Sequence, residues 1–179
     1  MCGRYQFELK SSRKGRQIKE RADKLNLVYK QGEIFPSDNV LCIIPVASKI
    51  DLSVMKWGIR QRSFQINARM ESINDRPSYR SFKDKRCAVI CNGFYEWDRN
   101  KEKYYVQTAD EYIYLGCIFN ENNELLIITR AADEEFSRIH ERKPLIMNQQ
   151  EMLKFIHNED CTITEKKLYW QSQQEIALF

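Results

Sequence analysis

Residues 112–129 read YIYLGCIFNENNELLIIT, and this stretch decides the fold. Two runs rich in β-branched, aromatic and aliphatic residues, Tyr112–Phe119 and Glu124–Thr129, flank a short polar segment that contains Asn122-Asn123. Runs of this composition are typical of strands, and paired asparagines favour the tight turn of a β-hairpin. We therefore predict two antiparallel strands joined at Asn122-Asn123.

Similar runs recur elsewhere in the chain, whereas helical patterns are few. Four more strands are predicted, at Val40–Val46, Leu52–Trp57, Ala88–Cys91 and Tyr104–Gln107. Apolar spacing of three and four residues predicts helices over Ser12–Leu25, Asp133–Ile139 and Gln149–His157. The sum is a β-rich α+β protein with one domain over residues 1–179. We expect a curved antiparallel sheet or open barrel with helices packed outside it.

Bulk composition indicates a soluble protein of the cytoplasm. The chain has 179 residues and is 42% hydrophobic, with no apolar run near the roughly 18 residues that span a bilayer and no signal-peptide pattern. Six cysteines form no CxxC pair, and four of them lie in apolar runs, as reduced core thiols do: Cys42, Cys87, Cys91 and Cys117. We expect no metal, no organic cofactor, no membrane partner and a monomer.

Positive charge is concentrated between Lys56 and Arg86. This stretch holds nine basic and three acidic residues, a net charge of +6, against +4 for the whole chain. A local basic excess is the usual footprint of a phosphate-bearing partner, although a solvated surface explains it equally well.

The chain begins Met1-Cys2-Gly3-Arg4-Tyr5. The small side chain of Cys2 predicts removal of Met1, which would leave a thiol and a free α-amine two carbons apart. An α-amine has a pKa near 7.7–8.0, so much of it is neutral and nucleophilic at physiological pH. Such an aminothiol attacks an aldehyde through nitrogen to give an imine, and the thiol then closes a thiazolidine ring. A chance cysteine at position 2 is the alternative.

Two further side chains are candidates for chemistry. Glu96 follows an apolar run and lies among aromatic residues, which would desolvate it and bring its pKa toward general acid–base range. His140 precedes Pro144 at the end of a predicted helix and is placed to face a pocket, whereas His157 lies in a polar tail and is expected at the surface. Ordinary structural roles remain open for both candidates.

Asn67 and Arg69 are candidates for holding a substrate. An amide donates and accepts at once, which suits orientation of a substrate oxygen. Arg69 would share the strand face of Asn67 and could bind a phosphate through two hydrogen bonds. Polar packing or turn chemistry is the alternative for each.

Together these segments resemble one family, the SRAP (SOS response-associated peptidase) domain. The resemblance runs from Met1 to about Met152, and the segments occur in the family's order. They are Met1-Cys2-Gly3-Arg4-Tyr5, Phe35-Pro36-Ser37, Trp57-Gly58, Ile66-Asn67-Ala68-Arg69-Met70-Glu71, Arg76-Pro77-Ser78-Tyr79-Arg80, Gly93-Phe94-Tyr95-Glu96-Trp97 and Ile139-His140-Glu141-Arg142-Lys143-Pro144.

The resemblance implies a protein of the DNA damage response that crosslinks covalently to abasic sites in single-stranded DNA and is nucleoid-associated when bound. It places the covalent nucleophile on Cys2, the orienting amide on Asn67, the acid–base carboxylate on Glu96 and the histidine on His140. It implies a phosphate contact at Arg69 and DNA-groove positions at Arg4, Trp57, Arg80 and Thr129. Trp57 and Trp97 would serve as stacking platforms for bases.

The chain departs from the family's pattern at three places. Lys143 stands where methionine is usual, Cys91-Asn92 replaces Ala-Asp, and Arg60-Gln61 replaces Ile-Pro. Two other functions stay open: a thiol peptidase in which Cys2 processes its own N-terminus, and a non-covalent single-stranded DNA-binding module. The sequence also leaves open whether the protein cleaves the DNA strand.

Overall fold

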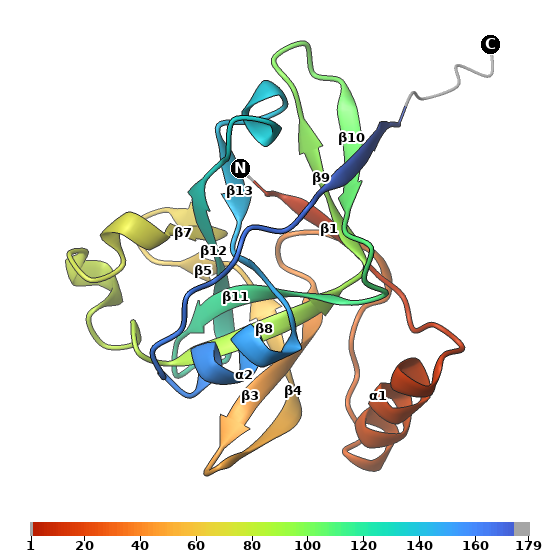
Figure 1. Ribbon diagram of the computed structural model, residues 1–179. Coiled ribbons are helices and arrows are strands. Elements are labelled where there is room, and N and C mark those ends of the chain that lie inside the picture. The colour runs from red at the N-terminus through yellow and green to blue at the C-terminus, as the bar shows by residue number, and fades with distance from the viewer. Residues whose placement is uncertain (1, 174–179) are drawn as a thin grey trace.

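The computed structural model describes residues 2–173, which fold around two curved sheets (Figure 1). The five-stranded sheet has the order β15 (Tyr169–Ser172), β10 (Lys103–Gln107), β9 (Gly93–Trp97), β1 (Arg4–Phe7) and β2 (Gly32–Ile34). The eight-stranded sheet has the order β13 (Arg142–Pro144), β12 (Glu124–Ala131), β4 (Lys49–Trp57), β3 (Asn39–Val46), β8 (Arg86–Cys91), β11 (Ile113–Phe119) and β14 (Ile146–Met147), with β7 (Asn67–Arg69) beside β12. A ribbon of β5 (Ile59–Arg60) and β6 (Phe64–Gln65) stands apart.

The predicted hairpin at Asn122-Asn123 is confirmed. Strands β11 and β12 pair antiparallel, with Phe119 opposite Leu125. Asn123 has a φ of 55°, a left-handed conformation that asparagine tolerates better than most residues. The six predicted strands all form, with boundaries shifted by at most three residues.

The sequence patterns predicted an antiparallel sheet, but the larger sheet also contains parallel pairs. Strand β12 runs parallel to both β4 and β7, with Leu125 opposite Trp57 and Thr129 opposite Arg69. The chain between these strands and β12 is long enough for the crossover that a parallel pair needs. Because β12 also pairs with β11, the sheet curls back on itself and carries β7 on its margin.

Two of the three predicted helices form as helices. α1 (Arg13–Lys24) begins at Ser12, whose side chain accepts a hydrogen bond from the Gly15 amide, and α2 (Gln149–Ile156) begins with a reciprocal capping box between Asn148 and Glu151. Both lie outside the sheets in Figure 1, and α2 packs against β8 and β11. None of the helices within residues 2–173 is long and apolar enough to cross a membrane.

The helix predicted over Asp133–Ile139 is wrong. The structure has only the 3₁₀ turn η3 (Phe136–Arg138) there. The Asp133 side chain binds the Phe136 amide at 2.9 Å and so competes with helical hydrogen bonding. Seven residues are also too few to sustain an α-helix without strong packing. Two further 3₁₀ turns, η1 (Met70–Ser72) and η2 (Pro77–Tyr79), follow β7.

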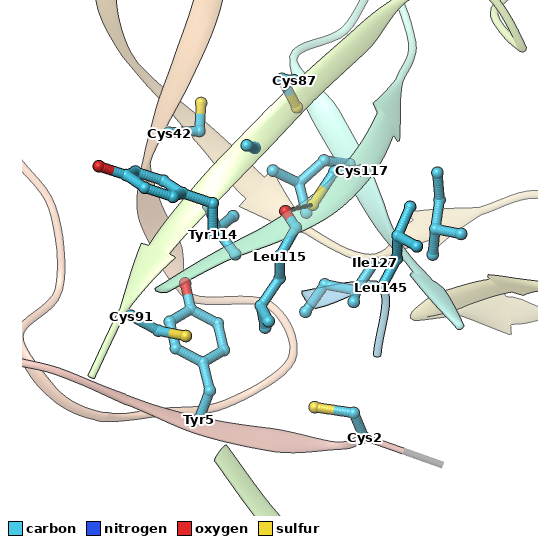
Figure 2. Close-up of a cluster of buried hydrophobic side chains, with 14 of the residues drawn as sticks. Cys2, Tyr5, Cys42, Cys87, Cys91, Tyr114, Leu115, Cys117, Ile127 and Leu145 are labelled. Atoms are coloured by element: carbon cyan, nitrogen blue, oxygen red, sulfur yellow. Dashed lines mark hydrogen bonds between the residues drawn. The ribbon is translucent and has the colours of Figure 1, made fainter. Parts of the chain in front are cut away.

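Side chains of both sheets share one hydrophobic core. Cys42, Cys87, Cys91 and Cys117 are buried, unpaired thiols in it, as predicted (Figure 2). Cys2 joins the same cluster from the start of β1. Cys2 therefore lies in the core instead of on the surface.

Candidate active site

Cys2 is held at the start of a central strand. β1 lies between β2 and β9, with Arg4 opposite Tyr95, so the N-terminus runs beside β9. The Cys2 side chain is fully buried, and its Sγ contacts the Arg4 carbonyl oxygen at 3.8 Å. Burial and then the nearby negative charge of Glu96 raise the pKa of the Cys2 thiol far above its ordinary value. The sulfur is therefore a protonated thiol at neutral pH.

Asn67 fixes the backbone of Cys2. It begins β7, which pairs in parallel with β12, and its Nδ2 donates to the Cys2 carbonyl oxygen at 3.0 Å. The Oδ1 of the same amide is buried and accepts no hydrogen bond from any group in residues 2–173. A buried acceptor of this kind costs free energy unless a ligand or water supplies a donor.

Glu96 lies on the inward face of β9. Alternation along the strand buries Phe94 and Glu96 and leaves Tyr95 and Trp97 half-buried. Glu96 is only 1% exposed. It is therefore not an outward-facing strand residue, the ordinary structural role that the sequence had left open. Burial raises the pKa of its carboxyl group above the ordinary value. Glu96 thus has the environment of a proton-transfer group.

His140 meets Glu96 from a separate segment. It follows η3, and its Nδ1 lies 3.5 Å from Oε1 of Glu96. The Arg142 backbone amide lies 2.9 Å from Nδ1 and the Arg142 carbonyl oxygen lies 3.2 Å from the same atom, so the Arg142 backbone fixes the orientation of the ring. His157, by contrast, is the half-buried C-cap of α2.

A cleft of about 420 Å³ opens beside these groups. One wall comes from Glu96 to Arg99 of the β9–β10 hairpin, and the other from Ser137 and Ile139 to Glu141 after η3. Asn67, Cys2, Glu96 and His140 therefore form a continuous series of neighbours from a strand edge to an open cleft. No group of three or more His, Cys, Asp or Glu side chains within residues 2–173 is placed to hold a metal ion.

Sequence reasoning missed a supporting residue, Arg142. Its guanidinium binds both carboxylate oxygens of Glu71, at 2.8 and 2.9 Å, and the Thr129 carbonyl oxygen at 2.7 Å. The pKa of Glu71 falls to about 2, chiefly through this hydrogen bonding. Arg142 thus connects the His140 segment to the turn that follows Arg69. Opposite charges in two of the quoted motifs were the available signal.

Four of the expected DNA-contacting residues reach the surface, to different degrees. Arg69 and Arg80 are exposed, and Trp97 is half-buried at the cleft. Arg4 lies over the rings of Phe35 and Trp97, at 4.3 and 5.1 Å, and pairs with Glu33 at 3.1 Å. Its charge is therefore partly neutralised, whereas no salt bridge within the described chain involves Arg69 or Arg80.

The other two expected DNA contacts are wrong. Trp57 is fully buried, packs against Tyr5 with ring centroids 5.4 Å apart, and donates its Nε1–H to the Ile66 carbonyl oxygen at 2.9 Å. Its ring has no exposed face on which a base could stack. Thr129 is also fully buried, against Arg142. Both residues support the site from within.

Two departures from the family's pattern have structural roles. Asn92 Oδ1 accepts from the Glu8 amide at 2.6 Å while its Nδ2 donates to the Glu111 carbonyl oxygen at 3.1 Å. An ionised aspartate could not make the second bond. Arg60 lies over the Phe64 ring, 5.3 Å from its centroid, within the β5–β6 ribbon.

Comparison with known proteins identifies the family of the chain. A sequence profile described as "SOS response associated peptidase (SRAP)" matches residues 1–178. The chain belongs to the SRAP family. Within it, the chain is 30% identical over 139 residues to the abasic site processing protein YoqW of Bacillus subtilis, which covers 65% of this chain and 62% of that protein. It is 24% identical over 142 residues to the abasic site processing protein YedK of Escherichia coli, covering 70% and 64%.

The chain thus spans just under two thirds of the length of these curated relatives. Solved structures share the fold of this SRAP protein. A crystal structure of a Bacteroides thetaiotaomicron protein superposes with a TM-score of 0.73 at 19% identity, covering 97% of this chain and 92% of that one. A Bordetella bronchiseptica protein gives 0.72 at 14% identity, covering 97% and 100%.

Proposed function

We propose that this SRAP protein binds single-stranded DNA and crosslinks covalently to abasic sites through Cys2 after removal of Met1. The observation that carries the proposal is that Asn67 binds Cys2, Glu96 acts electrostatically on the Cys2 thiol, and His140 meets Glu96 beside an open cleft. The relatives named abasic site processing proteins support the choice of substrate.

The reaction follows from an aminothiol meeting an aldehyde. A ring-opened abasic sugar presents an aldehyde carbon, which the Cys2 α-amine attacks with loss of one water to form an imine. The Cys2 thiol then adds across the carbon–nitrogen double bond, sulfur to carbon and proton to nitrogen, to close a thiazolidine. No oxidant, metal or cofactor enters this balance.

The state of Cys2 supports attack by nitrogen before sulfur. Its thiol is buried and has a raised pKa, so a thiolate is scarce. A cysteine peptidase needs the opposite, a thiol whose pKa is lowered by a neighbouring cation. Burial of Cys2 thus favours the aminothiol reaction over the peptidase alternative.

Glu96 and His140 divide the proton transfers. Glu96 has a raised carboxyl pKa and is a neighbour of Cys2, so it takes the proton from the attacking amine and returns it when the adduct reverses. His140, which lines the cleft, donates a proton to the sugar ring oxygen and promotes opening to the aldehyde. The free Oδ1 of Asn67 accepts a hydrogen bond from the adduct.

DNA binding rests on exposed positive charge. Arg69 and Arg80 belong to the basic stretch from Lys56 to Arg86 and are exposed. Trp97 at the cleft offers part of its ring for stacking. The phosphate contacts position the strand, while the aldehyde supplies the specificity.

Denaturing electrophoresis tests the proposal. Protein is incubated with a single-stranded oligonucleotide that carries one abasic site. Controls are the intact oligonucleotide and one whose abasic aldehyde has been reduced to an alcohol. We expect a slower-migrating covalent species only with the aldehyde and only when Cys2 is N-terminal. Binding without any covalent species would instead support a non-covalent DNA-binding module.

A further inference from the structure

Lys143 is a buried cation next to the site. The residue is 2% exposed, and its Nζ donates to the carboxylates of Asp133 and Glu165, the latter at 2.6 Å. Glu165 also pairs with Arg130 at 2.7 Å. A buried ammonium is tolerated only with such partners, because an unpaired buried charge is costly. The four side chains connect β12, the loop after it, β13 and the segment that follows α2.

Asp133 begins the turn that ends at His140. Its carboxylate accepts from the Phe136 amide at 2.9 Å, and its carbonyl oxygen accepts from the Ser137 amide at 2.9 Å. The Phe136 carbonyl oxygen in turn accepts from the His140 amide at 3.1 Å. The ion pair between Lys143 and Asp133 therefore fixes the base of the loop that carries His140.

The C-terminal arm, residues 158–173, joins both walls of the cleft. Strand β15 in this arm pairs with β10, which pairs with β9, the strand of Glu96. The Trp170 ring meets the Phe136 ring edge-on at 6.2 Å, and Glu165 holds Lys143. Figure 1 shows the arm as the dark-blue segment that passes from α2 across β12 and β13 to β15. The arm thus connects the Glu96 wall to the His140 wall.

We propose that Lys143 and Glu165 are positioning residues that set His140 against Glu96. Neither residue lines the cleft, so they act through the loop and not on the substrate. The inference rests on the proposed function for its kinetic consequence. Its structural part, the placement of the His140 ring, stands independently of any reaction.

Nuclear magnetic resonance of the histidine rings tests that placement. The chain has two histidines, so a His157→Gln variant assigns the His140 signals. The His140 ring signals also depend on the charged residues that line the cleft with it, which are Glu96, Asp98, Arg99 and Glu141. The Arg142 backbone amide contacts Nδ1 of His140. Lys143→Met removes the cation with little change in volume, and Glu165→Gln breaks the exposed half of the cluster without risk to the core. Both should change the chemical shifts and the tautomer ratio of the His140 ring.

Lys166→Met is the matched control. Lys166 is a poorly exposed lysine of the same arm, but it pairs with Glu151 of α2, at 2.7 Å. This variant should leave the His140 signals as in the parent protein. Unchanged signals in both Lys143→Met and Glu165→Gln would overturn the inference. Equal changes in Lys166→Met would also overturn it, because they would indicate general loosening of the arm.

Crosslinking rates give the second measurement. Lys143→Met should react about tenfold more slowly with a natural abasic site, a size typical of misplaced catalytic groups. It should react at the parent rate with an oligonucleotide bearing an aldehyde that cannot cyclise, because ring opening is then unnecessary. Adding Lys143→Met to His140→Ala should slow the reaction no further. Equal slowing of Lys143→Met on both substrates would overturn the inference. If the parent protein forms no crosslink, the proposed function is refuted, and the resonance experiment alone tests whether Lys143 and Glu165 position His140.

Discussion

At the scale of single residues, the site depends on burying groups that water would otherwise solvate. Cys2 and Glu96 are both nearly inaccessible, and burial raises the pKa of each. A neutral thiol near a carboxyl group of raised pKa would suit the stepwise proton transfers of the adduct formation that we propose. Exposed versions of the same residues would lack this tuning.

The stability of the protein should depend on pH through the buried carboxyl group of Glu96. Its pKa is raised above the ordinary 4.5, so ionising it opposes folding, and that penalty is absent below pH 4.5 and grows as pH rises through the raised pKa. Glu96→Gln cannot ionise. Melting curves of both proteins should therefore coincide in acid and separate at neutral pH, with the variant more stable. A separation that does not change with pH would contradict the raised pKa.

The same substitution should affect both the formation and the release of the crosslink. Glu96→Gln keeps the shape and hydrogen bonding of the side chain but cannot carry a proton, so it should slow both crosslinking and release. Rates are measured on denaturing gels, with excess unlabelled abasic DNA as a trap for release. His140→Ala should slow crosslinking most where the closed sugar predominates. A Glu96→Gln protein with parent rates in both assays would make Glu96 a structural residue.

At the scale of elements, short strands held by their neighbours assemble the site. β7 and β9 bring Asn67 and Glu96 to Cys2 through pairing with β12 and β1. The Trp57 indole donates to the carbonyl oxygen of Ile66, the residue before β7, and so holds the start of that strand in place. The element therefore depends on a residue that touches no substrate.

Removing that support should cost stability before it affects binding. Trp57→Phe keeps much of the packing but removes the indole donor from the Ile66 carbonyl oxygen, which still accepts from the Ile127 amide at 3.1 Å, so the expected loss is about 1 kcal/mol. Urea unfolding should show this loss, while affinity for undamaged single-stranded DNA stays at the parent value. A selective loss of DNA affinity with parent stability would restore Trp57 as a stacking platform.

Long strands were predictable from sequence, whereas short ones were not. Runs such as Tyr112–Phe119 contain enough apolar residues to be recognised as strands from sequence. β1, β2 and β13 to β15 have two to four residues each and exist because longer strands pair with them. The four central site residues were predicted from chemistry and motif order, and the fold makes them neighbours. Burial of Trp57 and Thr129 and the Glu71–Arg142 pair depend on three-dimensional packing that one sequence does not reveal.

At the scale of the whole molecule, charge is distributed unevenly around a shared core. The basic segment lies with β5, β6 and β7 on one side of Figure 1, and α1 lies on the other. Both sides are basic, because α1 holds six basic and two acidic residues, and a DNA strand on the β7 side would lie beside Asn67 and Arg69. Long-range attraction of this kind weakens as salt screens it.

Binding to single-stranded DNA should therefore weaken steeply with salt. The logarithm of the binding constant should fall with the logarithm of salt concentration, at about −0.7 per phosphate neutralised. Arg69→Ala should weaken binding alike for all base sequences and reduce that slope, whereas Lys24→Ala, an exposed cation at the end of α1, should change neither. Fluorescence anisotropy measures both. A salt-independent affinity, or a strong base preference, would contradict electrostatic binding.

The most direct test of the central claim is the intact mass of the crosslinked species before and after treatment with borohydride. A thiazolidine on Cys2 has the mass of protein lacking Met1 plus DNA minus one water, and borohydride should leave that mass unchanged. Cys2→Ala keeps the amine and stops at the imine, which borohydride should reduce with a gain of two hydrogen atoms. Protein that retains Met1 should form no adduct. An adduct of the Met1-bearing protein at the parent rate, or a parent adduct that gains hydrogen on reduction, would contradict the account.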